Sequence, residues 1–343
     1  MRRALLLMIL SVALVAQTPG STVQVPAMAG DATDEINAVI AAAPVGTMHR
    51  PTVVRFARNG RYRVDGTIRV DGKRHLLVDG NGSTFFTYDR VTARSRKHWY
   101  VVRGRDVRIT RVIVRGPYAN AGVHGDLHEA REHQAGFHVR DVDRFRLRHV
   151  AVSHVYGDGV FLGGAQPHAS PADWVSNARI SHFDFRHIGR QGVAIVGARN
   201  VLVARGFVSD TNRNAFSLEP SGPGDGYKNI TIRNNTVGTV GGKMAAIAGH
   251  RGTVGSYARL VDNTATATPI HTAIWGKGDQ HHIWVTGNTS LVRSRLVGPG
   301  GRERPPWIIY CEQTPHVYVW GNHQPLGEGM RMYATDGCGA RDS

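Results

Sequence analysis

Apolar and polar residues alternate with a period of two in many short segments of the chain, and Gly and Asn residues separate these segments. One apolar position recurs at intervals of 38, 33, 23, 29, 28, 25 and 34 residues, at Val107, Phe145, Ala178, Val201, Ile230, Ala258, Ile283 and Val317. A period of two indicates β-strands and excludes helical repeats, because an α-helix repeats every 3.6 residues. Constant strands at unequal intervals predict a parallel β-helix whose rungs carry loops of variable length.

A polar corner recurs after four of these strands, as Asn235-Thr236, Asn263-Thr264, Asn288-Thr289 and Asn322-His323. An Asn amide carries both a donor and an acceptor. Asparagines stacked in successive rungs can therefore hydrogen-bond to one another along the coil, and we expect such a ladder.

The end of the coil needs a cover, because exposed strand edges invite further pairing. Residues 34–43 read as a short helix with Ile36 and Ile40 on one face, acidic residues in its first turn and Pro44 after it. Short strands are expected at 52–56, 61–64, 67–70 and 75–78, so the N-terminal cap would span about residues 31–80. A C-terminal cap would span about residues 311–343.

The first 29 residues resemble a secretory signal peptide. Arg2 and Arg3 precede an unbroken apolar stretch from 4 to 16, which is too short to span a membrane. Ala27-Met28-Ala29 has the form of a cleavage site, and we place cleavage between residues 16 and 30. The protein is therefore expected to be secreted and extracellular, with one β-helix domain over residues 30–343.

Only two cysteines occur, Cys311 and Cys338. In an exported protein they are expected to form a disulfide that closes the C-terminal end of the coil. On the chain-entropy model this bond would add about 3 kcal/mol. A pair of free buried thiols is the alternative, and two cysteines alone do not make a zinc site.

The entry helix, the segment 56–64, the turn Val78-Asp-Gly-Asn-Gly82 and the repeated rungs together resemble the pectin-lyase-like superfamily. The resemblance covers nearly the whole mature chain. It implies an all-β, single-stranded right-handed parallel β-helix. Members are mostly secreted lyases, hydrolases and epimerases of polysaccharides, with phage tailspikes and adhesins as a less enzymatic minority.

The catalytic signatures of individual subfamilies are incomplete. Polygalacturonase-type hydrolases carry paired aspartates in a Gly-Asp-Asp motif, where this chain has Gly157-Asp158-Gly159. Their Gly-His-Gly motif is matched only in part by Gly249-His250-Arg251. Asp126-Leu127-His128-Glu129 is similar to the Asp-Pro-His-Glu of mannuronan epimerases, but Val123 replaces the tyrosine expected upstream. The resemblance thus implies the fold more strongly than the chemistry.

A second set of strands, at 135–139, 158–162, 191–195, 214–218 and 244–248, defines a candidate site. Alternation predicts that their small residues, Gly136, Gly159, Gly192, Ala215 and Ala245, face outward as the floor of a trough for an extended polymer. The column before them, Gln134, Gly157, Arg190, Arg213 and Lys243, would line one side of the trough with cations. Arg140 and Glu219 would lie on its far side, with His250 just beyond. The alternative is that the small residues merely satisfy a tight corner.

Cations beside a smooth floor favour an anionic chain, and β-elimination is the first reaction expected. A lyase must neutralise a uronate carboxylate and remove the proton beside it with a base. The catalytic candidates are Asp158, Arg190, Glu219 and His133. The candidates for substrate binding are Gln134, His138, Gln191, Arg213, Lys243 and His250.

A hydrolase is the second reading, with Asp158 and Glu219 as its two carboxylates. They lie two rungs apart, and the strand spacing of about 4.8 Å would separate them by about 10 Å along the axis, a distance that favours inversion. The structural alternatives are that Asp158 bonds backbone at its corner and that Glu219 pairs with Arg190 or Arg213.

The acidic, His-rich loop that lies one rung before Asp158 could also bind a cation. Asp126, Glu129 and Asp158 could supply oxygen ligands for calcium, and no other cofactor is expected. The alternative is a solvated loop whose charges pair with nearby arginines.

The net charge of +16 and the pI near 10.6 favour an anionic partner, although only five of the 42 basic residues are Lys. Nucleic acid is excluded for want of a motif or interleaved aromatics. The expected protein is a monomer without a membrane span that cleaves an acidic extracellular polysaccharide. A non-catalytic glycan-binding or surface-attachment protein is the competing class.

Overall fold

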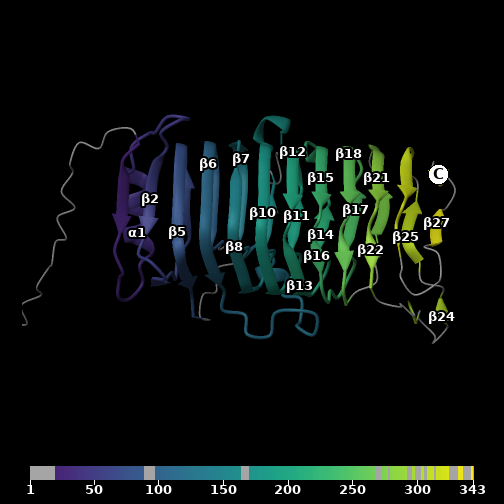
Figure 1. Cartoon of the computed structure of the whole chain (residues 1–343), viewed down its shortest axis with the longest axis horizontal. Helices are drawn as coiled ribbons and strands as arrows, with labels where there is room; N and C mark the ends of the chain where they lie inside the picture. The colour runs from purple at the N-terminus through teal and green to yellow at the C-terminus, as the bar shows by residue number, and fades with distance from the viewer. Residues whose placement is uncertain are drawn as a thin grey trace, which may run out of the picture.

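The computed structural model describes residues 20–88, 97–163 and 170–267, and beyond these 272–276, 279–291, 296–297, 303–304, 307–312, 314–323, 331–334 and 341–342. The apolar stretch of the expected signal peptide lies outside the described residues. The strands stack side by side along the long axis of the molecule (Figure 1), and each pairs in parallel with strands of the rungs before and after it. The chain is a parallel β-helix, as its sequence predicts.

Each rung contributes one strand to each of three faces, which we call face 1, face 2 and face 3. Face 1 contains β1(Thr22–Val25), β2(Thr52–Phe56), β12(Gly197–Ala204), β15(Gly226–Arg233), β18(Val254–Val261), β21(Asp279–Thr286), β26(Val317–Trp320) and β28(Arg341–Asp342). Face 2 contains β3(Arg61–Arg63), β13(Phe207–Thr211), β16(Thr236–Val237), β19(Thr264–Ala265) and β22(Thr289–Ser290). Face 3 contains β4(Ile68–Asp71), β9(Val160–Leu162), β11(Val193–Ile195), β14(Phe216–Leu218), β17(Ala245–Gly249), β20(Thr272–Gly276), β25(Trp307–Glu312) and β27(Arg331–Ala334).

The longer strands bend round a corner and serve more than one face. They are β5(Arg74–Phe86), β6(Trp99–Arg115), β7(Phe137–Asp143), β8(Arg146–Val155) and β10(Val175–Ile188). Two short 3-10 helices, η1(Glu129–Arg131) and η2(Pro171–Asp173), and the antiparallel pair β23(Leu296–Val297) and β24(Glu303–Arg304) lie in the connections. The apolar column predicted from the sequence is confirmed, because Ala178 pairs with Val201, Val201 with Ile230, and so on to Val317.

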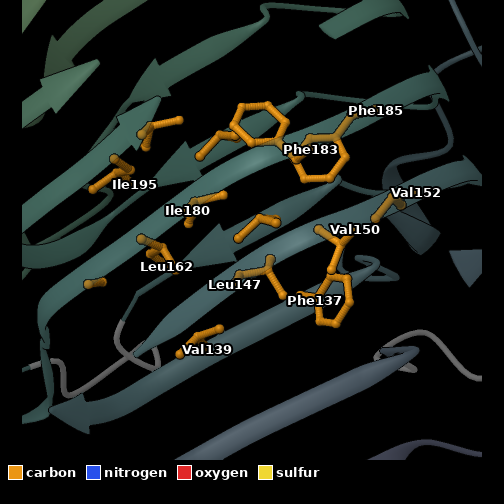
Figure 2. Packing of buried hydrophobic residues seen from close by; sticks show 14 of the residues in the cluster. Phe137, Val139, Leu147, Val150, Val152, Leu162, Ile180, Phe183, Phe185 and Ile195 are labelled. Carbon is orange, nitrogen blue, oxygen red and sulfur yellow. The ribbon is translucent and has the colours of Figure 1, made fainter. Parts of the chain in front are cut away.

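The core fills the space between the three faces. Inward residues of successive rungs, such as Phe137, Leu147, Ile180 and Ile195, are fully buried and contact one another along the axis (Figure 2). Phe183 and Phe185 stack with ring centroids 4.6 Å apart. Period-two alternation explains why every second residue of each strand points into this core.

The predicted asparagine ladder is confirmed at the corner between faces 1 and 2. Asn235 donates from Nδ2 to Oδ1 of Asn263, Asn263 to Asn288, and Asn288 to Asn322, each at 3.0 Å. The residue before each asparagine has a positive φ or is Gly, as at Asn234 with φ of 53°. One residue in the left-handed region per rung turns the chain, and the buried amide satisfies the backbone of the corner.

The helix α1(Thr33–Ala42) covers the N-terminal end of the coil and lies within one residue of its predicted bounds. Ile36 and Ile40 bury its inner face. The four short strands predicted after the helix are all present. They pair in parallel with β5 and β6, so they already belong to the coil and the cap is the helix itself. The first strand, β1, starts at Thr22, before the expected start of the domain at residue 30.

The C-terminal cap lies largely outside the described residues. Cys311 is fully buried in β25, whereas Cys338 lies outside the described part of the chain, so the disulfide stays a prediction. Among the residues that the structure describes, no helix is long and apolar enough to cross a membrane.

Candidate functional site

Two long connections border the outer surface of face 3. Residues 116–136 join β6 to β7 at the corner between faces 2 and 3, and they project beyond the strands near β13 (Figure 1). Residues 163–174 join β9 to β10 at the corner between faces 3 and 1, and 164–169 of them lie outside the described residues. We call residues 117–134 of the first connection the first wall, and the strands β7, β9, β11 and β14 of face 3 follow it along the chain.

The first wall is packed onto the coil over several rungs. Tyr118 stacks on Tyr156 of the next rung with ring centroids 4.5 Å apart, and His128 packs edge-on against both rings. Farther along the coil, the carboxylate of Asp210 accepts a hydrogen bond of 2.8 Å from the backbone N–H of Val123. These contacts hold residues 117–134 in a defined position, with their last residues next to face 3.

A charged cluster lies where this wall meets the corner before face 3. The guanidinium Nη1 of Arg190 is 3.0 Å from Oδ2 of Asp158, and its Nε is 3.6 Å from Oε2 of Glu132. The side chain of Asp158 is 1% exposed, that of Arg190 17% and that of Glu132 29%. Asp158 therefore holds Arg190 from beneath, while Glu132 reaches solvent.

A third carboxylate, that of Glu219, joins the cluster from the end of β14. Gln191 donates from Nε2 to Oε2 of Glu219 at 2.9 Å, and the backbone N–H of Gln191 donates to Oδ1 of Asp158 at 3.0 Å. Glu219 is partly exposed. Side chains thus join three rungs. Glu132 and Glu219, the two carboxylates that reach solvent, both raise the pKa of Arg190.

The electrostatics of the cluster are set by burial. Burial raises the pKa of Asp158 to about 6, and the charges of Glu219 and Glu132 add to this effect, although Arg190 and the N–H of Gln191 oppose it. The charge of Asp158 raises the pKa of Arg190 above its ordinary value. Arg190 stays a cation at every physiological pH, whereas Asp158 can take up a proton near pH 6.

The cluster also contains buried polar atoms that make no hydrogen bond. Within the described residues, Nε of Arg190, Oε1 of Gln191 and Oγ of Ser217 are buried and have no hydrogen-bond partner. Buried polar groups in folded proteins are nearly always paired, and exceptions concentrate at sites that bind something. These three residues belong to neighbouring rungs of the same face.

Toward the N-terminal end, face 3 presents a column of outward rings. Tyr100, His138 and Phe161 occupy paired positions, with centroids 5.3 Å and 4.6 Å apart. Burial lowers the pKa of His138, and the charges of Lys97, His133 and Arg140 lower it as well. Together they bring the pKa to about 3, so the imidazole is neutral. A hollow of about 370 Å³ beside this column is lined by residues that include Arg69, Tyr100 and Arg140.

The predicted floor of small residues is wrong. A Cβ at Gly136, Gly159 or Gly192 would lie within 2.6 to 3.0 Å of the core side chains of Val152, Phe185 and Val208. Ala215 in the same column is fully buried and belongs to the core. Alternation does not continue through the corner, so these positions face inward. The small residues serve a tight turn.

The predicted register is also wrong by one residue at the fifth strand. Phe216 pairs with Ala245, which places Ala245 and Ile247 inward, in place of the predicted Ala246 and Ala248. The backbone N–H of Ala215 bonds to the carbonyl of Lys243, so Lys243 aligns with Asn214 and not with Arg213. The outward small residues of face 3 are Ala194, Ser217, Ala246 and Ala273, and all four are buried.

The remaining predicted site residues border the cluster or lie away from it. Arg213 and His250 are exposed, and the backbone N–H of Arg213 donates to the carbonyl of Arg190 at 2.8 Å. Nζ of Lys243 lies over the ring of Trp275 at 5.1 Å. Gln134 is buried at the corner, one residue before the start of face 3. His133 is 59% exposed and lies 3.8 Å from Glu132.

The predicted calcium ligands are not brought together. Among the described residues, no group of three or more His, Cys, Asp or Glu side chains could hold a metal ion. The carboxylate oxygens of Asp158 are taken by Arg190 and Gln191. The loop position of Asp126 is fixed through its backbone carbonyl, which accepts the hydroxyl of Tyr118.

Sequence reasoning did not single out Glu132 as the partner of Arg190, or the rings of Tyr100 and Phe161. Glu132 lies within the acidic loop and two residues before the corner that leads into face 3. That spacing places it beside the next rungs, but only the packing of the wall shows which rung it meets.

No protein-family model matches the sequence, and no curated protein matches it in sequence. A tailspike of E. coli bacteriophage HK620, solved with a pentasaccharide, superposes with a TM-score of 0.57 at 11% identity over 87% of this chain and 55% of that one. A hyperthermoactive exopolygalacturonase from Thermotoga maritima gives 0.54 at 10% identity, over 89% and 88%. The catalytic domain of Agl-KA gives 0.54 at 12%, over 95% and 69%. The chain has the parallel β-helix fold that these proteins share, and at these identities the likeness shows the fold alone.

Proposed function

We propose that the chain is an exported, monomeric enzyme that binds an extracellular acidic polysaccharide along face 3 and cleaves it at the cluster around Arg190. The observation that carries the proposal is the placement of two solvent-reaching carboxylates, Glu132 and Glu219, in one cluster with a buried Arg190–Asp158 pair. This fold class includes an exopolygalacturonase and a tailspike solved with a saccharide, which supports a carbohydrate ligand.

Hydrolysis is the reaction that this cluster supports best. A glycosidase needs two carboxyl groups, one to protonate the leaving oxygen and one to activate water or attack the sugar. Glu132 and Glu219 reach solvent, whereas Asp158 is too buried to touch a substrate. We therefore assign catalysis to Glu132 and Glu219, and a positioning role to Asp158 and Gln191, which hold Arg190 and Glu219 respectively.

The pKa of Asp158 gives this assignment a pH signature. Below about pH 6 Asp158 takes up a proton and its attraction for Arg190 weakens. The field at Glu132 and Glu219 then changes, because Asp158 no longer balances the charge of Arg190. We expect turnover to change with an apparent pKa near 6, and we expect Asp158→Asn to remove that inflection.

β-Elimination is the second candidate. Arg140 and Lys97 lie near the neutral imidazole of His138 on the same face, and cations of this kind could neutralise a uronate carboxylate. His133 is exposed and could remove a proton. Arg190 is a poor base for this reaction, because the neighbouring carboxylates raise its pKa.

Product analysis tests the proposal. The mature chain is incubated with polygalacturonate, alginate and neutral dextran, and the products are analysed by mass spectrometry. Saturated fragments that have gained water would support hydrolysis, and unsaturated fragments would move the assignment to β-elimination. Polymer that is bound but not shortened would identify a non-catalytic glycan-binding protein and overturn the enzymatic proposal.

A further inference from the structure

Face 1 presents arginines at the same position of successive rungs. Arg108 pairs in register with Arg146, and Arg146 with Arg179, on β6, β8 and β10. Their side chains point outward, because the residues on either side of each, such as Phe145 and Leu147, are buried in the core. Arg148 and Arg205 are exposed on the same face. We call Arg146, Arg148, Arg179 and Arg205 the face-1 arginine array.

No ion pair with a described residue neutralises this array. Several arginines elsewhere are paired: Arg103 lies 2.6 Å from Asp71, and Arg186 lies 2.7 Å from Asp184. The nearest acidic groups of face 1 are already engaged. Asp106 binds His75 and Arg108, and Asp143 accepts hydrogen bonds from Ser176 and Asn177. The centre of face 1 therefore carries a net positive charge.

Such an arrangement works against stability. Like charges on directly opposed residues of adjacent strands repel each other, and the strands here are about 4.8 Å apart. The field is felt by His182, whose pKa is lowered by burial and then by the charges of Arg148, His149, Arg205 and Arg179. A stack of unpaired arginines on an open sheet face is better explained by an external anion than by folding.

We propose that the face-1 arginine array binds a linear acidic polysaccharide, whose sulfate, carboxylate or phosphate groups lie along the coil axis. The guanidinium group suits these anions, because its planar fork donates two parallel hydrogen bonds. Repeated cations at the rung spacing match a polymer with repeated anionic groups. This surface is separate from face 3, and the proposal does not depend on catalysis there.

Nucleic acid fits the array less well. Single strands bind on grooves in which aromatic side chains stack with the bases. The outward neighbours of the array are Thr110, Ser181 and Leu202, and none of them is aromatic. The aromatic residues of face 1 lie at its C-terminal end, where Trp284 and Tyr318 stack on each other with centroids 5.3 Å apart. The rings beside the array are the imidazoles of His149 and His182, with centroids 4.9 Å apart. The described part of the array therefore offers charge without a platform of Phe, Tyr or Trp.

The test uses fluorescein-labelled dextran sulfate, polygalacturonate, neutral dextran and a single-stranded oligonucleotide, with binding followed by anisotropy over a range of salt. The variant replaces Arg146, Arg148 and Arg179 with Gln. The matched control replaces Arg58, Arg115 and Arg251, which are exposed away from the array, with Gln and has the same net charge. Unfolding midpoints are compared first to establish that both variants fold.

We expect the array variant to bind dextran sulfate at least about ten-fold more weakly than wild type at moderate salt, and to lower the slope of log affinity against log salt by about two. The control should bind within two-fold of wild type. Equal losses in the array variant and the control, or no loss in either, would overturn the proposal. Oligonucleotide binding as tight as dextran sulfate binding, with the same dependence on the array, would overturn the choice of polysaccharide.

Discussion

Two corners of the same coil bury polar side chains in opposite ways. Between faces 1 and 2, Asn263 donates to Asn288 and accepts from Asn235, so its amide is fully paired. Between faces 2 and 3, Nε of Arg190 and Oε1 of Gln191 have no hydrogen-bond partner among the described residues. The first corner repeats asparagine in four rungs, whereas the second holds Asp158, Gln191, Asn214 and Lys243 at one position of successive rungs.

The difference separates a polar group that stabilises the coil from one that is held for a ligand. A repeated, satisfied ladder contributes hydrogen bonds in a low dielectric. An unrepeated cluster with a raised carboxyl pKa carries a cost in stability that only a function explains. The two corners should therefore respond differently to substitution, both in size and in pH dependence.

The largest effect is expected for Arg190→Met. The substitution leaves the buried Asp158 without its cation, and removal of one member of a buried pair costs about 4 kcal/mol. The loss should be measured by urea unfolding at pH 7.5. At pH 5 the loss should be clearly smaller, because Asp158 is then largely protonated and needs no cation. An equal loss at both pH values would contradict the role assigned to Asp158.

Asp158→Asn tests the same pair from the other side. The folded pKa of Asp158 is about 6 against an ordinary value of 3.8, so the folded state binds the proton more tightly. Wild type should therefore lose about 3 kcal/mol of its free energy of unfolding as pH rises from 4 to above 6, relative to the Asn variant. Parallel pH profiles for the two proteins would show that Asp158 has an ordinary pKa.

Asn263→Leu breaks the ladder. The leucine removes the acceptor of the backbone N–H of Asn235 and the donor to the carbonyl of Ile232, and we expect a loss of about 2 to 3 kcal/mol at every pH between 5 and 8. A second, exposed ladder on face 1 has Asn229 donating to Asn200 and Asn200 to Asn177. Asn229→Gly is the control in this second ladder, because Asn229 has a positive φ of 55° that Gly adopts freely. The control should change stability by less than about 0.5 kcal/mol.

Asp210→Ala should loosen the wall without unfolding the coil. It removes the acceptor of the Val123 N–H, at an expected cost of about 1 kcal/mol. Hydrogen exchange should then quicken in residues 117–134, whereas protection in β10 and β12 stays as in wild type. Faster exchange throughout the coil would show that Asp210 supports the rungs themselves.

The repeated parts of the molecule could be predicted from the sequence, because alternation recurs along the coil and the asparagine corner recurs in four successive rungs. The corner before face 3 could not. Gly136 and Gly192 were expected to face outward, but a turn interrupts the alternation and directs them into the core. The one-residue error at Lys243 has the same origin, since a corner of variable length does not fix the register of the strand after it.

The sequence did single out four of the residues that meet in the cluster: Asp158, Arg190, Gln191 and Glu219. Stacking at a constant strand spacing brings aligned residues together, so their proximity follows from the register alone. The part played by Glu132 does not follow, because it depends on how Tyr118 packs on Tyr156 and Val123 on Asp210. Contacts of a long loop are set by tertiary packing and not by a local pattern.

The most direct test of the central claim is the turnover of Glu219→Gln on whichever polysaccharide wild type cleaves, measured together with its unfolding midpoint. The amide retains a partner for Gln191, so the midpoint should not change. Loss of the carboxylate should lower turnover by at least about 100-fold, the usual contribution of a general acid or base. Turnover equal to that of wild type, at an unchanged midpoint, would contradict the assignment of the active site to this cluster.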